Sequence, residues 1–213
     1  MIGLIGKKLG MTQVFAPDGT LVSVTIIQAG PCTVVQKKTQ QRDGYTALQL
    51  GFGVRKLQRA TKALRGHCKA AGAEPFSVLR EFGIDDVDGY EVGNALTVGQ
   101  IFQPGEMIAV VGRTKGRGYA GVIKRHGMSG FPAARGTHEY FRHGGSIGNR
   151  SYPGRVFKGK RMAGQYGNDR MTAVHLRVIE VRPDANLLFV RGAVPGARGG
   201  VVLVHKEVAK VRR

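Results

Sequence analysis

The sequence predicts a mainly β protein with an inserted α+β part and a long, irregular basic extension. Short β-branched runs separated by glycine and proline predict a small barrel or sandwich. One stretch without strand character predicts the insertion, and one glycine-rich stretch with excess lysine and arginine predicts the extension. With 213 residues, 42% of them hydrophobic, the chain is long enough to bury a core.

The first strands are expected to form a hairpin. Leu21–Ile27 is rich in β-branched residues and follows Pro17-Asp18-Gly19, where proline fixes φ and Asp-Gly closes the corner. This turn joins the run to Met11–Ala16. Further strands are expected at Thr33–Gln36, Ala47–Leu50, Leu96–Phe102, Met107–Val111 and Val201–Val204.

A second hairpin is expected near the C-terminus. Val174–Val178 alternates apolar and polar residues, Pro183-Asp184 supplies a turn, and Leu187–Val190 returns. Between the hairpins, Arg59–Ala71 and Glu74–Phe82 lack strand character. Because Pro75 suits a first helical position and Gly83 a helix end, both stretches are expected to be helical.

The charge of the chain is unevenly distributed. The net charge is +19, but residues 74–111 sum to −6, while residues 113–170 hold 13 lysines and arginines against two carboxylates. The latter range also contains 13 glycines and few aliphatic side chains, so it cannot supply much core of its own. So long a structureless stretch is unusual in a free domain. Its charge predicts a polyanionic partner that orders it.

The residue types in this range suit nucleic acid. Arginine offers a planar fork for bidentate phosphate contact, and lysine offers a point charge. Glycines let the backbone approach closely, and interleaved aromatic rings can stack on unpaired bases. These aromatic residues, each of which could instead pack on the protein, are Phe131, Tyr140, Phe141, Tyr152, Phe157 and Tyr166. The candidate nucleic-acid-binding residues are Arg113, Lys115, Arg117, Lys124, Arg125, His126, Arg135, His138, Arg142, His143, Ser146, Asn149, Arg150, Arg155, Lys158, Lys160 and Arg161.

RNA is favoured over DNA on indirect grounds. The sequence contains no helix-turn-helix, basic-zipper or zinc-finger pattern that could read a major groove. An irregular basic extension suits the varied crevices of a folded RNA better than a uniform duplex. Sequence physics alone is also compatible with a DNA-compacting protein or a nucleic-acid chaperone without a fixed site.

Two motifs resemble enzyme signatures and are interpreted otherwise. Gly116–Gly121 matches the dinucleotide-binding pattern, but glycines and Pro132 soon follow, and Glu139 is the only acidic residue near the ribose-ligand spacing. Gly144–Gly148 matches the nucleophile elbow around Ser146, but Pro153-Gly154 prevents the helix that this motif requires. No enzymatic activity is therefore expected.

Other classes of site and location are also disfavoured. The histidines of the basic range lack cysteine or carboxylate partners at metal-ligand spacing, so neither a metal nor a cofactor is expected. No apolar run is long enough to cross a membrane, and the order of charges at the N-terminus is the reverse of a signal peptide. Cys32 and Cys68 are far apart and are expected to be reduced thiols in the cytoplasm.

The ordered motifs of the whole chain resemble the bacterial L3 family of large-subunit ribosomal proteins. The resemblance begins with Gly3–Thr12 and is most specific in Thr114–Arg125. It continues through Gly144–Gly148, Pro153–Lys160 and Gly192–Gly196.

The resemblance implies a translation-protein β-barrel of six strands with a long finger. The expected parts are a discontinuous barrel over residues 1–58, 93–125 and 165–213, an inserted α+β unit over 59–92, and an extended basic finger over 126–164. Family members are ribosomal proteins of the cytoplasm that bind 23S rRNA near its 3′ domain and help to nucleate early assembly. Their finger approaches the peptidyl-transferase centre. Their neighbours include proteins of the L14 and L19 families, and no small-molecule substrate is implied.

The resemblance also bears on one possible modification site. Some members carry, at the position of Asn149, a glutamine that is methylated on its side-chain nitrogen. Because this chain has asparagine there, the resemblance does not carry the modification over directly.

Overall fold

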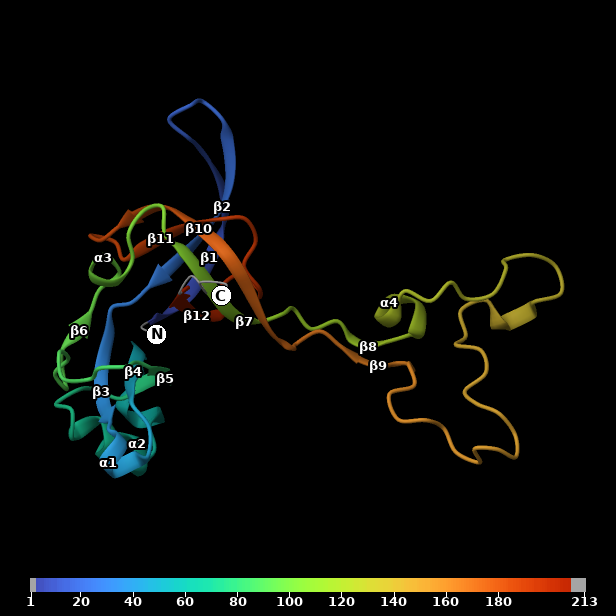
Figure 1. Ribbon diagram of the computed structural model, residues 1–213, viewed down its shortest axis with the longest axis horizontal. Helices are drawn as coiled ribbons and strands as arrows, with labels where there is room; N and C mark the ends of the chain where they lie inside the picture. Colours follow the sequence, from blue (N-terminus) through green and yellow to red (C-terminus); the bar gives the residue numbers. More distant parts are fainter. Residues whose placement is uncertain (1–2, 208–213) are drawn as a thin grey trace, which may run out of the picture. The chain divides into compact units, whose positions relative to one another are not determined.

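The computed structural model describes residues 3–207 and confirms a mainly β fold with a closed barrel of six antiparallel strands (Figure 1). The strand order around the barrel is β1-β12-β7-β10-β11-β2. Residues 1–2 and 208–213, at the outer ends of the expected barrel ranges, lie outside the described residues. The barrel strands are β1 (Gly3–Phe15), β2 (Leu21–Ala29), β7 (Met107–Arg113), β10 (Arg170–Arg182), β11 (Leu187–Arg191) and β12 (Val201–Lys206).

The barrel encloses an aliphatic core because alternate side chains of each strand point inward. Ile27 of β2, Ile108 of β7, Leu188 of β11 and Val204 of β12 are all fully buried in one cluster. Strands that are far apart in the sequence meet here, since β12 pairs with both β1 and β7.

A second sheet, ordered β5-β4-β3-β6, continues from the barrel through β3. Thr61 caps the helix beside it, accepting a hydrogen bond from the Leu64 amide, and Cys68 of that helix is buried with Val35 and Phe76. The strands of this sheet are β3 (Cys32–Lys38), β4 (Ala47–Val54), β5 (Phe76–Gly83) and β6 (Ala95–Leu96). Helices α1 (Gln40–Asp43) and α2 (Lys62–Lys69) and a 3-10 turn at Leu57–Arg59 accompany this sheet, whereas α3 (Val98–Ile101) contacts β10 of the barrel.

Both predicted hairpins are present. In the β1–β2 turn the Ala16 amide donates to the Thr20 carbonyl at 2.9 Å, and the Asp18 carboxylate accepts from the Thr20 amide and hydroxyl. In the β10–β11 turn the Asn186 amide donates to the Pro183 carbonyl at 3.1 Å. Each turn was predictable because its geometry depends on residues next to one another.

The helix predicted at Glu74–Phe82 is wrong, because Phe76–Gly83 is strand β5. Its whole length pairs with β4, from Val54 opposite Phe76 to Ala47 opposite Gly83. Pro75 precedes a strand here, and its carbonyl accepts the Arg55 amide at 2.7 Å. Pairing with a partner strand about 30 residues away overrides the local signals for a helix.

The strand predicted at Leu96–Phe102 is mostly wrong. Only Leu96 belongs to a strand, and Val98–Ile101 forms helix α3. The Gln100 side chain accepts the Thr97 amide at 2.9 Å, as in a capping box. That Thr-x-x-Gln spacing was the overlooked helix signal.

The described chain divides into two compact units, Thr114–Asp169 and the remainder, which is called the barrel unit below. The smaller of these, called the basic unit below, has little regular structure. It contains β8 (Gly118–Ala120), α4 (Val122–His126), β9 (Gly164–Tyr166) and a 3-10 turn at His138–Tyr140. Strands β8 and β9 form a separate two-stranded sheet.

Candidate nucleic-acid interface

The basic unit has a high positive charge and almost no core. It contains 11 lysines and arginines, and its carboxylates are Glu139 and Asp169. Its only buried hydrophobic side chains are Ala120 and Val122, and nearly every residue from 131 to 162 is exposed. Hydrophobic burial therefore contributes little to holding this unit in one conformation.

The base of the basic unit is closed by backbone hydrogen bonds between its two ends. The Thr114 amide donates to the Asp169 carbonyl at 2.9 Å, and the Arg117 amide donates to the Tyr166 carbonyl at 2.8 Å. Gly167 has φ +71°, and a Cβ on it would overlap the Lys115 carbonyl. Only glycine fits that position, so the sequence permits the two ends to approach closely.

Two of the predicted site residues join helix α4 to the segment just before β9. The guanidinium Nη1 of Arg125 donates to the Met162 carbonyl at 2.8 Å, and His126 Nε2 lies 3.0 Å from the same oxygen. Gly164 lies beneath Arg125, where a Cβ would come within 2.8 Å of Nη1. Both side chains therefore have a role in the unit's internal structure that the sequence did not reveal.

The other predicted cations are exposed. Lys115 and Arg117 precede β8, Lys124 lies on α4, and Arg113 is the last residue of β7 in the barrel unit. Among residues 3–207, no lysine or arginine of the basic unit forms an ion pair with a carboxylate. The remaining exposed predicted residues, all in the irregular part, are Arg135, His138, Arg142, His143, Ser146, Asn149, Arg150, Arg155, Lys158, Lys160 and Arg161.

One group of cations borders a concave surface. Arg155, Val156, Phe157 and Lys158 line a hollow of about 440 Å³, and Phe157 is exposed beside the two charges. A hollow that combines two cations and an aromatic ring suits a phosphate together with a base.

The aromatic side chains divide into two groups. The Arg117 guanidinium lies 4.9 Å from the ring centre of Tyr166, and the rings of Tyr140 and His143 are 4.5 Å apart. In contrast, Tyr152 is 88% exposed and Tyr119 is 79% exposed. Tyr119 is not among the aromatic residues predicted from the sequence. Its position between two small residues, Gly118 and Ala120, and close to Arg117 is a signal that could have indicated it.

The enzyme-like motifs lack catalytic geometry. The Ser146 hydroxyl donates to the Gly148 carbonyl at 2.9 Å within its own turn, and no histidine among residues 3–207 forms a hydrogen bond with it. A helix does open after Gly121, but α4 has only five residues and ends at Gly127.

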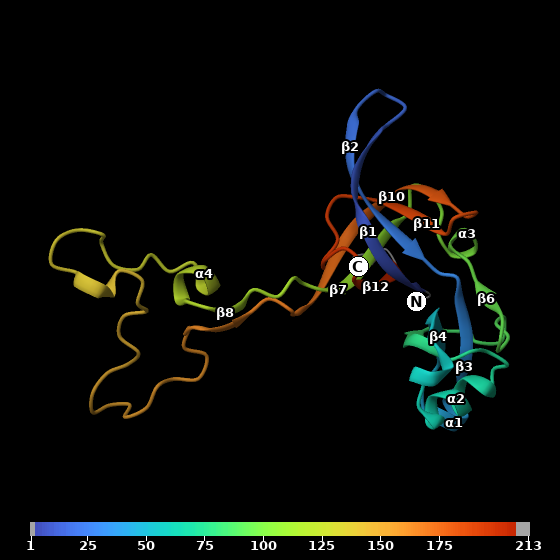
Figure 2. The same cartoon turned by 180° about the vertical axis from the view of Figure 1, so that it is seen from behind.

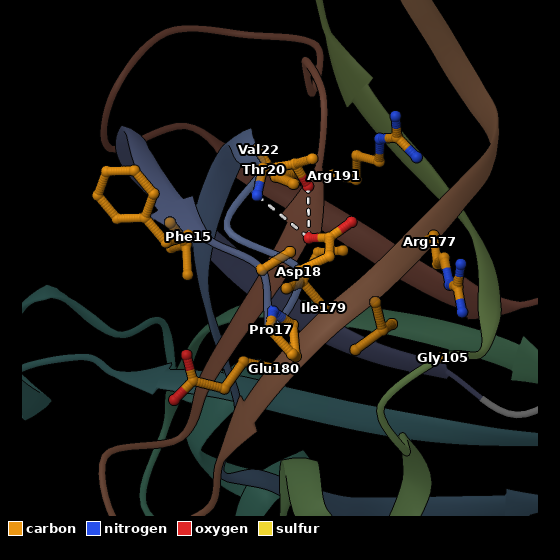
Figure 3. Close-up of a pocket in the computed structure, with 13 residues that line it drawn as sticks. Phe15, Pro17, Asp18, Thr20, Val22, Gly105, Arg177, Ile179, Glu180 and Arg191 are labelled. Atoms are coloured by element: carbon orange, nitrogen blue, oxygen red, sulfur yellow. Dashed lines mark hydrogen bonds between the residues drawn. The ribbon is translucent and has the colours of Figure 1, made fainter.

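The barrel unit contains a cleft of about 600 Å³ beside the β1–β2 turn (Figure 3). The Asp18 carboxylate in it accepts hydrogen bonds from Thr20, which hold its pKa below the usual value. Arg177 and Arg191 lie on the far side, and the Thr20 hydroxyl donates to the Asp18 carboxylate within the turn at 2.7 Å. Within residues 3–207, no group of histidine, cysteine and carboxylate side chains could hold a metal, and no helix is long and apolar enough to span a membrane.

The fold and the basic unit together define the class: a β-barrel protein that carries an uncompensated cationic unit. Comparison with known proteins identifies the particular kind. The family model described as "Ribosomal protein L3" matches residues 86–187.

Curated relatives extend the match to nearly the whole chain, and each is named large ribosomal subunit protein uL3. The protein of Syntrophobacter fumaroxidans is 52% identical, covering 95% of this chain and 96% of the relative. The protein of Pelotomaculum thermopropionicum is 51% identical, covering 99% of this chain and 98% of the relative. The protein of Thermotoga petrophila is 48% identical, covering 97% of both chains.

The chain therefore belongs to the ribosomal protein L3 family, uL3. It is a structural protein of the large ribosomal subunit in the cytoplasm and not an enzyme.

Proposed function

We propose that this chain binds 23S rRNA directly, near its 3′ domain, and helps to nucleate assembly of the large subunit. The basic unit supplies the main RNA contacts, and its finger, residues 126–164, extends toward the peptidyl-transferase centre. The observation that carries the proposal is the row of exposed cations without any carboxylate partner among residues 3–207.

The energetics of the basic unit support an RNA partner. Ordering a residue costs roughly 1–2 kcal/mol of backbone entropy, and this unit recovers little of that cost by burial. Contacts with phosphates release counterions and can offset the cost. The unit is therefore expected to become ordered when RNA neutralises it.

The candidate side chains have different roles in this proposal. Arg155, Lys158 and Lys160 contact phosphates, and Tyr152 and Phe157 are available to stack on unpaired bases. Arg125 and His126 hold α4 against Met162, which positions the neighbouring Lys124. Asn149 is exposed within the finger and is the residue at which a side-chain modification would be sought.

The barrel unit is proposed to contact neighbouring proteins of the L14 and L19 families. The competing function is that of a nucleic-acid-binding module or RNA chaperone without a fixed site. The two differ in selectivity, because a subunit component prefers one RNA, whereas a polycation binds all RNAs of equal charge alike.

The test is binding of the purified chain to a 3′-domain fragment of 23S rRNA, with an unrelated structured RNA as competitor, across a series of salt concentrations. Preference for the fragment that persists at high salt supports the proposal. Equal competition by both RNAs, with a steep dependence on salt, favours the chaperone.

Replacing Arg155, Lys158 and Lys160 by alanine is predicted to weaken binding to every RNA tested. If each contacts one phosphate, the slope of log K against log salt becomes shallower by about 2–3. The matched control replaces Lys56, Lys62 and Lys69 by alanine, which removes the same amount of positive charge from the barrel unit. An unchanged slope in the first variant, or equal effects of both, would contradict the assignment.

A further inference from the structure

We propose that the projecting end of the β1–β2 hairpin is a docking site for an extended segment of a neighbouring protein. This end, residues 10–23, is called the hairpin arm. Figures 1 and 2 both show it passing beyond the other barrel strands. Strand β12 pairs with β1 only over Gly3–Lys7, and β11 pairs with β2 only over Val24–Gln28. Within the described residues, the two strands of the arm therefore pair only with each other, except that the Ser23 carbonyl at the base of the arm accepts the Gly192 amide at 2.9 Å.

The β1 edge of the arm is open to a further strand. The Ala16 amide donates to the Thr20 carbonyl, and hydrogen-bonded pairs alternate along an antiparallel ladder. Met11, Gln13 and Phe15 consequently turn their amide and carbonyl groups away from β2. Natural sheets block such an edge with lysine, proline or a bulge. Residues 11–15 contain neither residue type, and the register shift of β1 lies before them, between Lys8 and Gly10.

One face of the arm carries an exposed apolar row. Phe15 lies opposite Leu21, and Met11 lies on the same face of β1 because side chains alternate along a strand. Phe15 is 74% exposed, and Met11 and Leu21 are each 54% exposed. Figure 3 shows the Phe15 ring pointing away from Asp18. Solvent-facing apolar side chains gathered beside a free edge mark an interaction surface.

The charge of the arm indicates a protein partner. No lysine or arginine occurs from residue 9 to residue 36, in a chain that has 33 of them. The arm's one charged residue is Asp18, whose lowered pKa keeps it anionic. Arg177 and Arg191 line the far side of the Asp18 cleft, but the β1 edge and the apolar row themselves offer RNA phosphates no cation. A strand with alternating apolar side chains and a lysine or arginine near Asp18 satisfies the edge, the apolar row and the charge together.

The inference relies on the proposed function only for where the neighbour is found, namely in the large subunit. It assigns the arm to protein contact and leaves RNA contact to the basic unit. The two assignments can therefore fail independently.

The first test places the photoreactive residue p-benzoylphenylalanine at position 15 in assembled large subunits. The expected product is a crosslink to another protein, identified by mass spectrometry. A crosslink to rRNA, a crosslink to a second copy of this chain, or no crosslink would overturn the inference. The same residue at position 119 in the basic unit is expected to crosslink rRNA, so the two positions report the two proposals separately.

The second test blocks the open edge. Gln13→Pro removes an amide that points outward and leaves the β1–β2 ladder intact, whereas the control Gln13→Ala keeps that amide. The protein crosslink from position 15 is expected to be lost in Gln13→Pro and retained in Gln13→Ala. The same result in both variants would exclude strand addition. If Gln13→Pro does not fold, Met11→Lys, which places a charge in the apolar row, is expected to abolish the crosslink, and its persistence would overturn the inference.

Discussion

His205 of β12 lies where the barrel meets the second sheet. Its ring centre is 5.0 Å from that of Phe82 on β5, with the planes inclined at 47°. Burial lowers the pKa of this imidazole, and the positive charge of Arg170 acts in the same direction. The folded protein therefore favours the neutral ring, which packs against Phe82 without a charge to desolvate.

This environment predicts a loss of stability in mild acid. Because the folded pKa of His205 is depressed, its contribution is complete above the unfolded pKa of about 6.5 and is lost as the pH falls below it. The urea midpoint of unfolding is expected to fall between pH 7 and pH 5. In His205→Phe, which keeps the ring and removes the titration, the fall should be smaller. An equally large fall in that variant would assign the pH dependence to other groups.

At the scale of the element, the second sheet shows how a glycine can be required by a neighbouring strand. Gly51 of β4 lies beneath the ring of Phe76 on β5, and a Cβ at position 51 would overlap that ring. Gly51→Ala is predicted to cost about 1–3 kcal/mol through overpacking, measured by chemical unfolding. Gly83→Ala on the same sheet is the control, since its Cβ would meet nothing nearer than 4.0 Å. Equal effects of the two substitutions would contradict this explanation.

The elements that sequence predicted well depend on adjacent residues. Pro17-Asp18-Gly19 determines its turn locally, and so does Pro183-Asp184. Strand β5 was mistaken for a helix because its partner β4 lies far away in the sequence, and α3 was missed because its apolar residues suit a strand equally well. Local signals predicted these turns, but they do not identify which strand pairs with which.

The same distinction applies to the candidate interface. Its location and charge followed from composition, because residues 113–170 contain 13 cations and only two carboxylates. The attachment of Arg125 and His126 to the Met162 carbonyl could not be predicted from composition, because these residues are 36 or 37 positions apart from Met162 in the sequence. The hairpin arm was predicted as a hairpin, but its free edge depends on how far β11 and β12 reach, which only the barrel determines.

At the scale of the whole molecule, the buried core belongs to one unit. Both hydrophobic clusters of the described chain are built without any residue from 114 to 169. The barrel unit can therefore satisfy its own packing, while the basic unit contributes charge and exposed rings. This separation lets the chain combine a stable scaffold with a segment whose order depends on its partner.

A deletion tests this separation. Strands β8 and β9 end opposite each other at Ala120 and Gly164, so residues 121–163 can be replaced by an Asn-Gly turn. The thermal midpoint of this variant is predicted to stay within about 4 °C of the full chain, because no core contact is lost. Preference for the 3′-domain RNA fragment should disappear, and the salt slope should become much shallower, because nine cations are removed.

The two measurements on the deletion distinguish different errors. A large drop in the thermal midpoint with RNA preference retained would mean that residues 121–163 support the barrel and that RNA is recognised elsewhere. A stable variant that still prefers the fragment would transfer the RNA site to the cations of the barrel unit. Only a stable variant without preference fits a molecule in which the barrel provides the scaffold and the basic unit provides the recognition.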